Sequence, residues 1–143
     1  MVDFKVVLSD TKNGKAYNVA ATGAAASSFI GKRVGQEINA APLGFDGYTI
    51  KITGASDKNG TPARQSLPIS GRRRSLLRGG VGFHPVMEGQ RRRKMIRGSE
   101  ITADFVQINA IVTQYGSKTL EQYFAPPEPE AETQPEAETQ PEE

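Results

Sequence analysis

The sequence predicts a mainly β protein, in which a small β-barrel with one short α-helix is followed by a disordered acidic tail. Several segments alternate polar and apolar residues with a period of two, which is the pattern of half-buried strands. Turn-forming stretches rich in Asn, Asp and Gly separate them, and a single Ala-rich segment carries helical spacing. A split sheet or an α+β layer is the alternative arrangement of the same elements.

The first third of the chain predicts a hairpin and the helix. Residues 2–9 alternate well enough for a strand, and residues 10–14 end in an Asn-Gly pair that tolerates positive φ, so residues 15–22 should return as a second strand. Residues 24–35 place three bulky apolar side chains at near-helical spacing. Thr22 stands before them as a candidate N-cap, so we predict one short helix here.

Two further strands are predicted later in the chain. Residues 48–53 alternate cleanly, with Tyr48, Ile50 and Ile52 on the apolar face, and residues 57–60 make the turn that follows. Residues 105–113 are rich in β-branched side chains and alternate again. We expect one face of this strand to carry Val106, Ile108, Ala110 and Val112.

The charge of the chain is segregated. Residues 126–143 hold seven Glu and no base, whereas residues 1–125 hold eighteen bases and nine acids. A body of this size forms one compact core, so we predict a single domain over residues 1–124. The Pro/Glu-rich tail over residues 125–143 repeats Pro-Glu-Ala-Glu-Thr-Gln twice and has too little apolar surface to offset the entropy of ordering, so we expect it to be disordered.

The sequence offers no recognisable catalytic chemistry. The absence of Cys excludes disulfides, thiolate zinc sites and cysteine nucleophiles, and the only histidine, His84, has no second His for a ligand set or relay. Gly31 and Lys32 resemble part of a phosphate loop, but Arg33 and the preceding residues break that pattern. No apolar stretch is long enough to span a membrane. We therefore expect no active site, no metal, no cofactor, no small-molecule substrate, no membrane association and a cytoplasmic location.

A basic window is the main functional signal. Ten of the eighteen Lys and Arg residues lie between Arg64 and Arg97, where Glu88 is the only acid, while the rest of the chain before residue 126 has eight bases and eight acids. Unpaired charges are costly to bury, so these side chains must face water or a polyanion. The candidate RNA-binding residues are Arg64, Arg72, Arg73, Arg74, Arg78, His84, Arg91, Arg92, Arg93, Lys94 and Arg97.

The composition of the window favours nucleic acid over a merely solvated basic face. Arg outnumbers Lys nine to one, and its planar guanidinium matches phosphate oxygens. Phe83 is the only aromatic residue in the window, which fits phosphate contacts on folded RNA better than a platform of stacked bases. Charge alone does not separate RNA from DNA, so a sequence-independent DNA-binding or chromatin-like module is the alternative. We expect residues 79–89, which hold four Gly and one Pro, to be mobile in the free protein and ordered on RNA.

Several motifs together resemble one family, the small-subunit ribosomal protein six of archaea and eukaryotes. Its signature is a hydrophobic residue, a small residue, Gly-Gly, any residue, Asp, two residues, then Gly-x-Pro-Met. Residues 52–63 read Ile-Thr-Gly-Ala-Ser-Asp-Lys-Asn-Gly-Thr-Pro-Ala, so that Ala55 replaces the second Gly and Ala63 replaces the Met. Further matches are Leu-Gly at 43–44, Gly-Tyr-Thr-Ile at 47–50, Gly-Arg-Arg-Arg-Ser-Leu-Leu at 71–77 and Gly-Gln-Arg-Arg-Arg-Lys-Met-Ile-Arg-Gly at 89–98.

The resemblance covers roughly residues 1–115 and implies a β-barrel body bound to small-subunit ribosomal RNA, beside neighbouring ribosomal proteins. It implies no enzymatic activity and no cofactor. The chain looks like the short archaeal form, because an acidic tail stands where eukaryotic members carry a long basic helical extension. The departure from the family pattern at Ala55 indicates that this backbone position does not need positive φ here.

Overall fold

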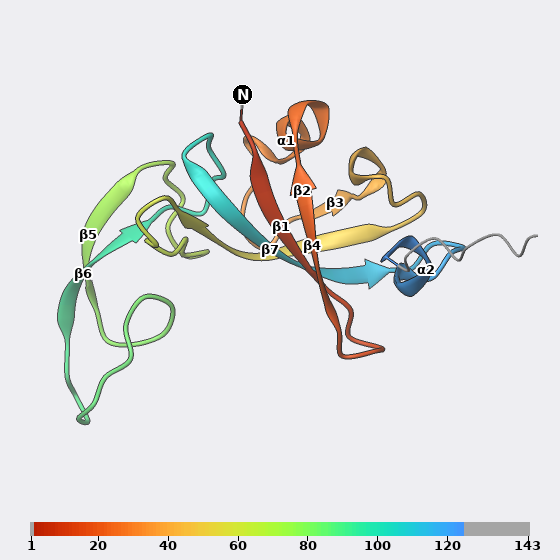
Figure 1. Cartoon of the computed structure of the whole chain (residues 1–143). Helices are drawn as coiled ribbons and strands as arrows, with labels where there is room; N and C mark the ends of the chain where they lie inside the picture. Colours follow the sequence, from red (N-terminus) through yellow and green to blue (C-terminus); the bar gives the residue numbers. More distant parts are fainter. Residues whose placement is uncertain (1, 125–143) are drawn as a thin grey trace, which may run out of the picture.

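The computed structural model describes residues 2–124, and the predicted disordered tail over residues 125–143 lies outside the described residues. Strands dominate this part of the chain (Figure 1). In chain order the elements are β1 (Phe4–Ser9), β2 (Ala16–Ala21), α1 (Gly23–Phe29), β3 (Glu37–Asn39), the 3-10 turn η1 (Ala41–Leu43), β4 (Thr49–Asp57), β5 (Arg72–Leu77), β6 (Arg92–Arg97), β7 (Phe105–Gln114) and α2 (Leu120–Phe124).

The strands form two separate sheets. A five-stranded sheet has the order β2-β1-β7-β4-β3, in which β1 and β7 are parallel and the other neighbours antiparallel. The antiparallel pair β5-β6 stands away from this sheet at one end of the molecule (Figure 1). We call β5, β6 and the loop between them, residues 72–97, the arm. The mainly β class is confirmed, but both sheets are open and do not close into a barrel, because the edge strands β2 and β3 do not pair with each other.

The main core lies against the five-stranded sheet. Alternate residues of β1, β4 and β7 supply it, and α1 adds Ala26 and Phe29, whose ring meets that of Phe4 edge to face at 6.5 Å. The arm has its own small cluster of Leu77, Phe83 and Ile96. Burying three such side chains contributes about 5–9 kcal/mol, which is far less than the backbone entropy of ordering the whole arm at about 1–2 kcal/mol per residue. The arm therefore depends on its attachment to the body.

The strands predicted at residues 2–9, 15–22, 48–53 and 105–113 are confirmed as β1, β2, β4 and β7. One face assignment is wrong, because Val106 is 42% exposed and Phe105 takes the buried position in its place. The cause is a register shift where Phe105 and Gln107 pair with consecutive residues of β4, which leaves Val106 in a bulge. Ile108, Ala110 and Val112 are buried as expected.

The helix is present but shorter than the predicted residues 24–35. It ends at Phe29, because the backbone of Ile30 is extended, with ψ of 133°, and Gly31 then turns the chain with a left-handed φ of 79°. Thr22 occupies the N-cap position, although its side chain makes no capping hydrogen bond. Val34 is buried outside the helix, next to a β-bridge formed by Arg33.

Candidate nucleic-acid interface

The two arginine runs of the basic window pair with each other as the strands of the arm. The register sets Arg74 opposite Met95 and Ser75 opposite Lys94. Side chains alternate between the two faces of a strand, so one face of the arm carries Arg74, Leu76, Arg93 and Met95, all exposed. The other face carries Arg73, Arg92 and Lys94 beside the buried Leu77 and Ile96. Positive charge therefore lies on both faces of the arm.

Most of the predicted RNA-binding residues are exposed on the arm. Seven of the cations are exposed and form no salt bridge with any residue in the range 2–124, and we call these the exposed arm cations: Arg73, Arg74, Arg78, Arg91, Arg92, Arg93 and Lys94. His84 is exposed on the loop. Arg64 is half-buried and donates to Ser66 Oγ and to the carbonyls of Gly79 and Val81, so it ties the loop to the body.

Arg97 is turned inward instead of outward. Its side chain is 5% exposed, and Nη2 donates to Thr102 Oγ1 and to Asp104 Oδ2, each at 2.7 Å. The guanidinium also lies over the ring of Phe105, 4.6 Å from its centroid. The expectation that every residue of the window faces water or a polyanion is corrected at this position, because local carboxylates compensate the buried charge.

Asp57, the last residue of β4, joins Arg97 and Arg72 at the base of the arm. Its Oδ2 accepts from Arg72 Nε at 2.6 Å and from Arg97 Nη1 at 3.3 Å. Its Oδ1 accepts the backbone N–H groups of Asn59 and Thr61 at 2.8 and 3.0 Å. One buried carboxylate thus fixes both the following turn and the first and last residues of the paired arm strands.

These contacts explain the acidity of Asp57. Burial alone would raise its pKa, but the N–H of Thr61, the Arg72 guanidinium, the N–H of Asn59 and Arg97 together lower the pKa from 3.8 to about 2. The pKa of Asp104 is also lowered, by its hydrogen bond to Arg97. Asp57 is therefore ionised throughout the physiological range, and it neutralises charge that would otherwise repel across the base of the arm.

Backbone hydrogen bonds also join the base of the arm to the body. Arg97 donates its N–H to the carbonyl of Pro62 and accepts from Arg64 N–H, both at 3.0 Å, and it forms a β-bridge with Ala63. Gly98 has no room for a side chain, because a Cβ there would lie 1.5 Å from the carbonyl oxygen of Ile69. The motif over residues 52–63 therefore builds the support of the arm.

The structure also accounts for the two departures in that motif. Ala55 is buried in β4 opposite Ile108 and has no positive φ, in agreement with the expectation for that position. Ala63 is buried in the main core, beside its bridge to Arg97.

Sequence reasoning did not identify Asp57 as part of the site. It was assigned only to a turn, and its partners lie fifteen and forty residues further along the chain. The available signal was its position as the single acid of the motif over residues 52–63. Elsewhere in residues 2–124, no group of three or more His, Cys, Asp or Glu comes together to hold a metal ion. No helix within that range is long and apolar enough to cross a membrane.

Comparison with known proteins gives a consistent result. The family model for ribosomal protein S6e matches residues 4–125. The small ribosomal subunit protein eS6 of Methanospirillum hungatei is 72% identical over 131 residues, which cover 92% of this chain and 97% of that protein. The proteins of the same name from Methanoculleus marisnigri and Archaeoglobus fulgidus are 61% and 44% identical and cover 92% and 86% of this chain, and 100% and 96% of their own lengths.

Proposed function

The chain belongs to the ribosomal protein S6e family, and from this premise we propose that its arm binds the ribosomal RNA of the small subunit. As a member of this family the chain is a structural ribosomal component and not an enzyme. The proposal extends to its surroundings: a cytoplasmic, ribosome-associated protein whose partners are small-subunit ribosomal RNA and neighbouring ribosomal proteins. It treats residues 1–124 as the RNA-binding domain.

The observation that supports an RNA contact through the arm is the separation of its charges into two groups. Arg72 and Arg97 are neutralised at the base by Asp57 and Asp104. The seven exposed arm cations have no such partner among residues 2–124. These cations repel one another in the free protein, and bound phosphate groups would relieve that repulsion. The guanidinium of Arg can also donate two parallel hydrogen bonds to the oxygens of one phosphate. A projecting two-stranded arm can also enter spaces between RNA helices that the body cannot reach.

The interface predicted by this proposal differs from the residue set expected from sequence. Arg73, Arg74, Arg78, Arg91, Arg92, Arg93 and Lys94 are the proposed phosphate contacts, and His84 is proposed to lie at their edge. Arg72, which is half-exposed, is shared between Asp57 and the surface. Arg64 and Arg97 are proposed to act indirectly, because their donors are used within the protein.

A salt-dependence measurement tests the proposal. If about five to seven phosphates are contacted, log K for a small-subunit rRNA fragment should fall against log salt with a slope of about −4 to −6. Replacing Arg91, Arg92 and Arg93 by Ala should flatten that slope by about two to three. The matched control replaces the exposed Lys5, Lys12 and Lys51 by Ala. This change removes the same charge from outside the arm and should leave the slope nearly unchanged. Equal slopes for the two triple variants would contradict the proposal.

A further inference from the structure

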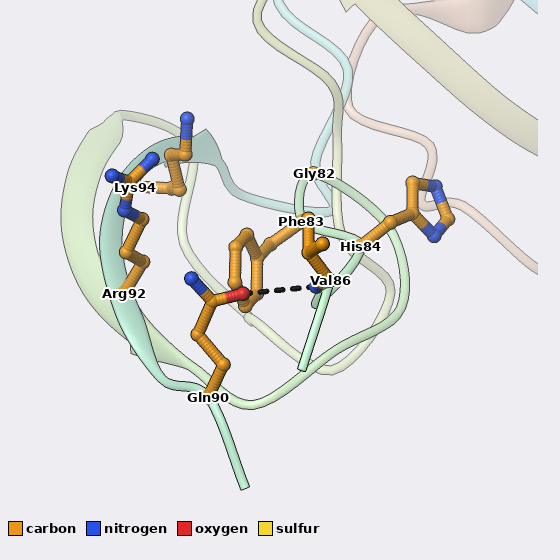
Figure 2. A pocket seen from close by; sticks show the side chains of 7 residues that line it. All are labelled: Gly82, Phe83, His84, Val86, Gln90, Arg92 and Lys94. Atoms are coloured by element: carbon orange, nitrogen blue, oxygen red, sulfur yellow. Dashed lines mark hydrogen bonds between the residues drawn. The ribbon is translucent and has the colours of Figure 1, made fainter. Parts of the chain in front are cut away.

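A cavity of about 400 Å³ lies between β6 and the loop that precedes it (Figure 2). It is lined by Phe83, His84, Val86, Gln90, Arg92 and Lys94, with the backbone of Gly82 on one side. This volume falls within the roughly 300–1,000 Å³ of sites that hold small molecules, and it is too small for a nucleic-acid helix. Its occupant must therefore be a single small group, and the proposed RNA contact supplies candidates.

The apolar part of the cavity suits a planar group. Phe83 is packed against Leu77 and Ile96 and is 7% exposed, so a small, fixed part of its ring borders the cavity. Val86 stands at the rim with 91% of its surface exposed and belongs to neither apolar cluster of residues 2–124. An exposed Val beside a buried aromatic ring offers van der Waals contact to a flat ligand. A nucleobase presents such a surface whatever its sequence.

The polar part of the cavity consists of hydrogen-bond donors. Gln90 Oε1 accepts the N–H of Val86 at 2.9 Å, which fixes the side-chain amide so that its NH₂ group lies on the side of Arg92 and Lys94 (Figure 2). Arg92 and Lys94 are two residues apart on one face of β6, and both are exposed. The imidazole of His84 points away from them (Figure 2). The ligand must therefore bring acceptors, as phosphate and keto oxygens do.

We infer that this cavity receives one unpaired nucleotide of the bound RNA, turned out of its helix. The base lies against Phe83 and Val86, a keto oxygen of the base accepts from Gln90, and the adjoining phosphate accepts from Arg92 and Lys94. Uracil fits this donor set because two keto oxygens flank the single N–H donor of its Watson–Crick edge. The inference rests on the proposed function, and it adds a base contact to an interface otherwise made of phosphate contacts.

The test compares two RNA hairpins that differ only in a single bulged uridine. The full-length protein should bind the bulged hairpin about fivefold more tightly than the fully paired one, which is the lower end of the effect of one base–aromatic contact, because only part of the Phe83 ring is accessible. Val86→Ala removes the rim, and Gln90→Glu keeps the acceptor for the Val86 N–H but replaces the donor by a carboxylate. Both variants should bring the ratio close to one while still binding the paired hairpin.

The control variant is Met87→Ala, which truncates an exposed apolar side chain of the same loop outside the cavity and should keep the fivefold ratio. A ratio of one for the wild type, with salt-dependent binding of both hairpins, would overturn the nucleotide site and leave the RNA contact of the arm intact. Failure of both hairpins to bind would refute the proposed function itself.

Discussion

Neutralising Asp57 should loosen the arm, because this carboxylate holds both ends of the paired strands. Asp57→Asn keeps an acceptor for the N–H groups of Asn59 and Thr61, but it removes the negative charge between Arg72 and Arg97. Arg97 is then left buried with Asp104 as its one carboxylate partner within residues 2–124. A substitution that leaves a buried charge with less compensation is among the most destabilising single changes.

The magnitude follows from the acidity of Asp57. Lowering its pKa from 3.8 to about 2 corresponds to about 2 kcal/mol of stability at neutral pH. Breaking a buried ion pair costs about 3–5 kcal/mol when one partner remains buried, and Asp104 reduces that penalty here. We therefore expect Asp57→Asn to lower the free energy of unfolding by about 2–4 kcal/mol.

The pH dependence has a definite sign. A carboxyl whose pKa is lower in the folded state stabilises the protein above its unfolded pKa, and this contribution is lost as the pH falls through the folded pKa. The wild type should lose the contribution of Asp57 between about pH 5 and pH 1. The Asp57→Asn variant should be less stable at neutral pH and should show a flatter decline with acid.

Urea unfolding at several pH values measures both effects, and amide hydrogen exchange in β5 and β6 locates them. The matched control is Asp46→Asn, which removes one exposed carboxylate from the body and should change the free energy of unfolding by less than about 0.5 kcal/mol. A loss below about 1 kcal/mol for Asp57→Asn, with unchanged exchange in the arm, would refute the view that this carboxylate holds the arm to the body.

Two further predictions concern the base and the loop of the arm. Gly98→Ala should destabilise the protein by about 1–3 kcal/mol in the same unfolding assay, because its Cβ would overlap the Ile69 carbonyl. Gly71→Ala is the control, since a Cβ there has open space and should be tolerated. Equal effects of the two changes would count against close packing of Gly98 on Ile69. Backbone relaxation should show residues 79–89 more mobile than β4 without RNA and ordered with it, since Phe83 and the Arg64 hydrogen bonds to Gly79 and Val81 hold only the first half of the loop, whereas residues 84–89 are all exposed; a loop as rigid as β4 in the free protein would contradict this.

A structural feature of this protein can be predicted from its sequence when the residues that cause it are close together in the chain. The strands of the five-stranded sheet are visible because period-two alternation and Asn-Gly turns are local signals. The strands of the arm are hidden, because runs of adjacent arginines show no alternation and like charges opposed across strands are unfavourable. Sequence also does not reveal that the sheet is open. Its strand order depends on the parallel pairing of β1 with β7, which joins the two ends of the body and leaves no local signal.

The same distinction applies to the candidate site. The position of the seven exposed arm cations follows from the cost of burying unpaired charge, which a sequence reveals. The inward turn of Arg97 depends on Asp57, forty residues earlier, and on Asp104, and only the folded chain brings these side chains together. The bulge that exposes Val106 is equally invisible, because the register between β4 and β7 sets it.

Crosslinking within the assembled small ribosomal subunit tests the central claim most directly. Irradiation of the reconstituted particle, followed by identification of the peptides joined to RNA, reports which residues lie against ribosomal RNA. We expect the crosslinked peptides to fall mainly in residues 72–94, with the exposed arm cations and the cavity beside Phe83 represented. Crosslinks confined to the five-stranded sheet, with the arm peptides free of RNA, would contradict the account.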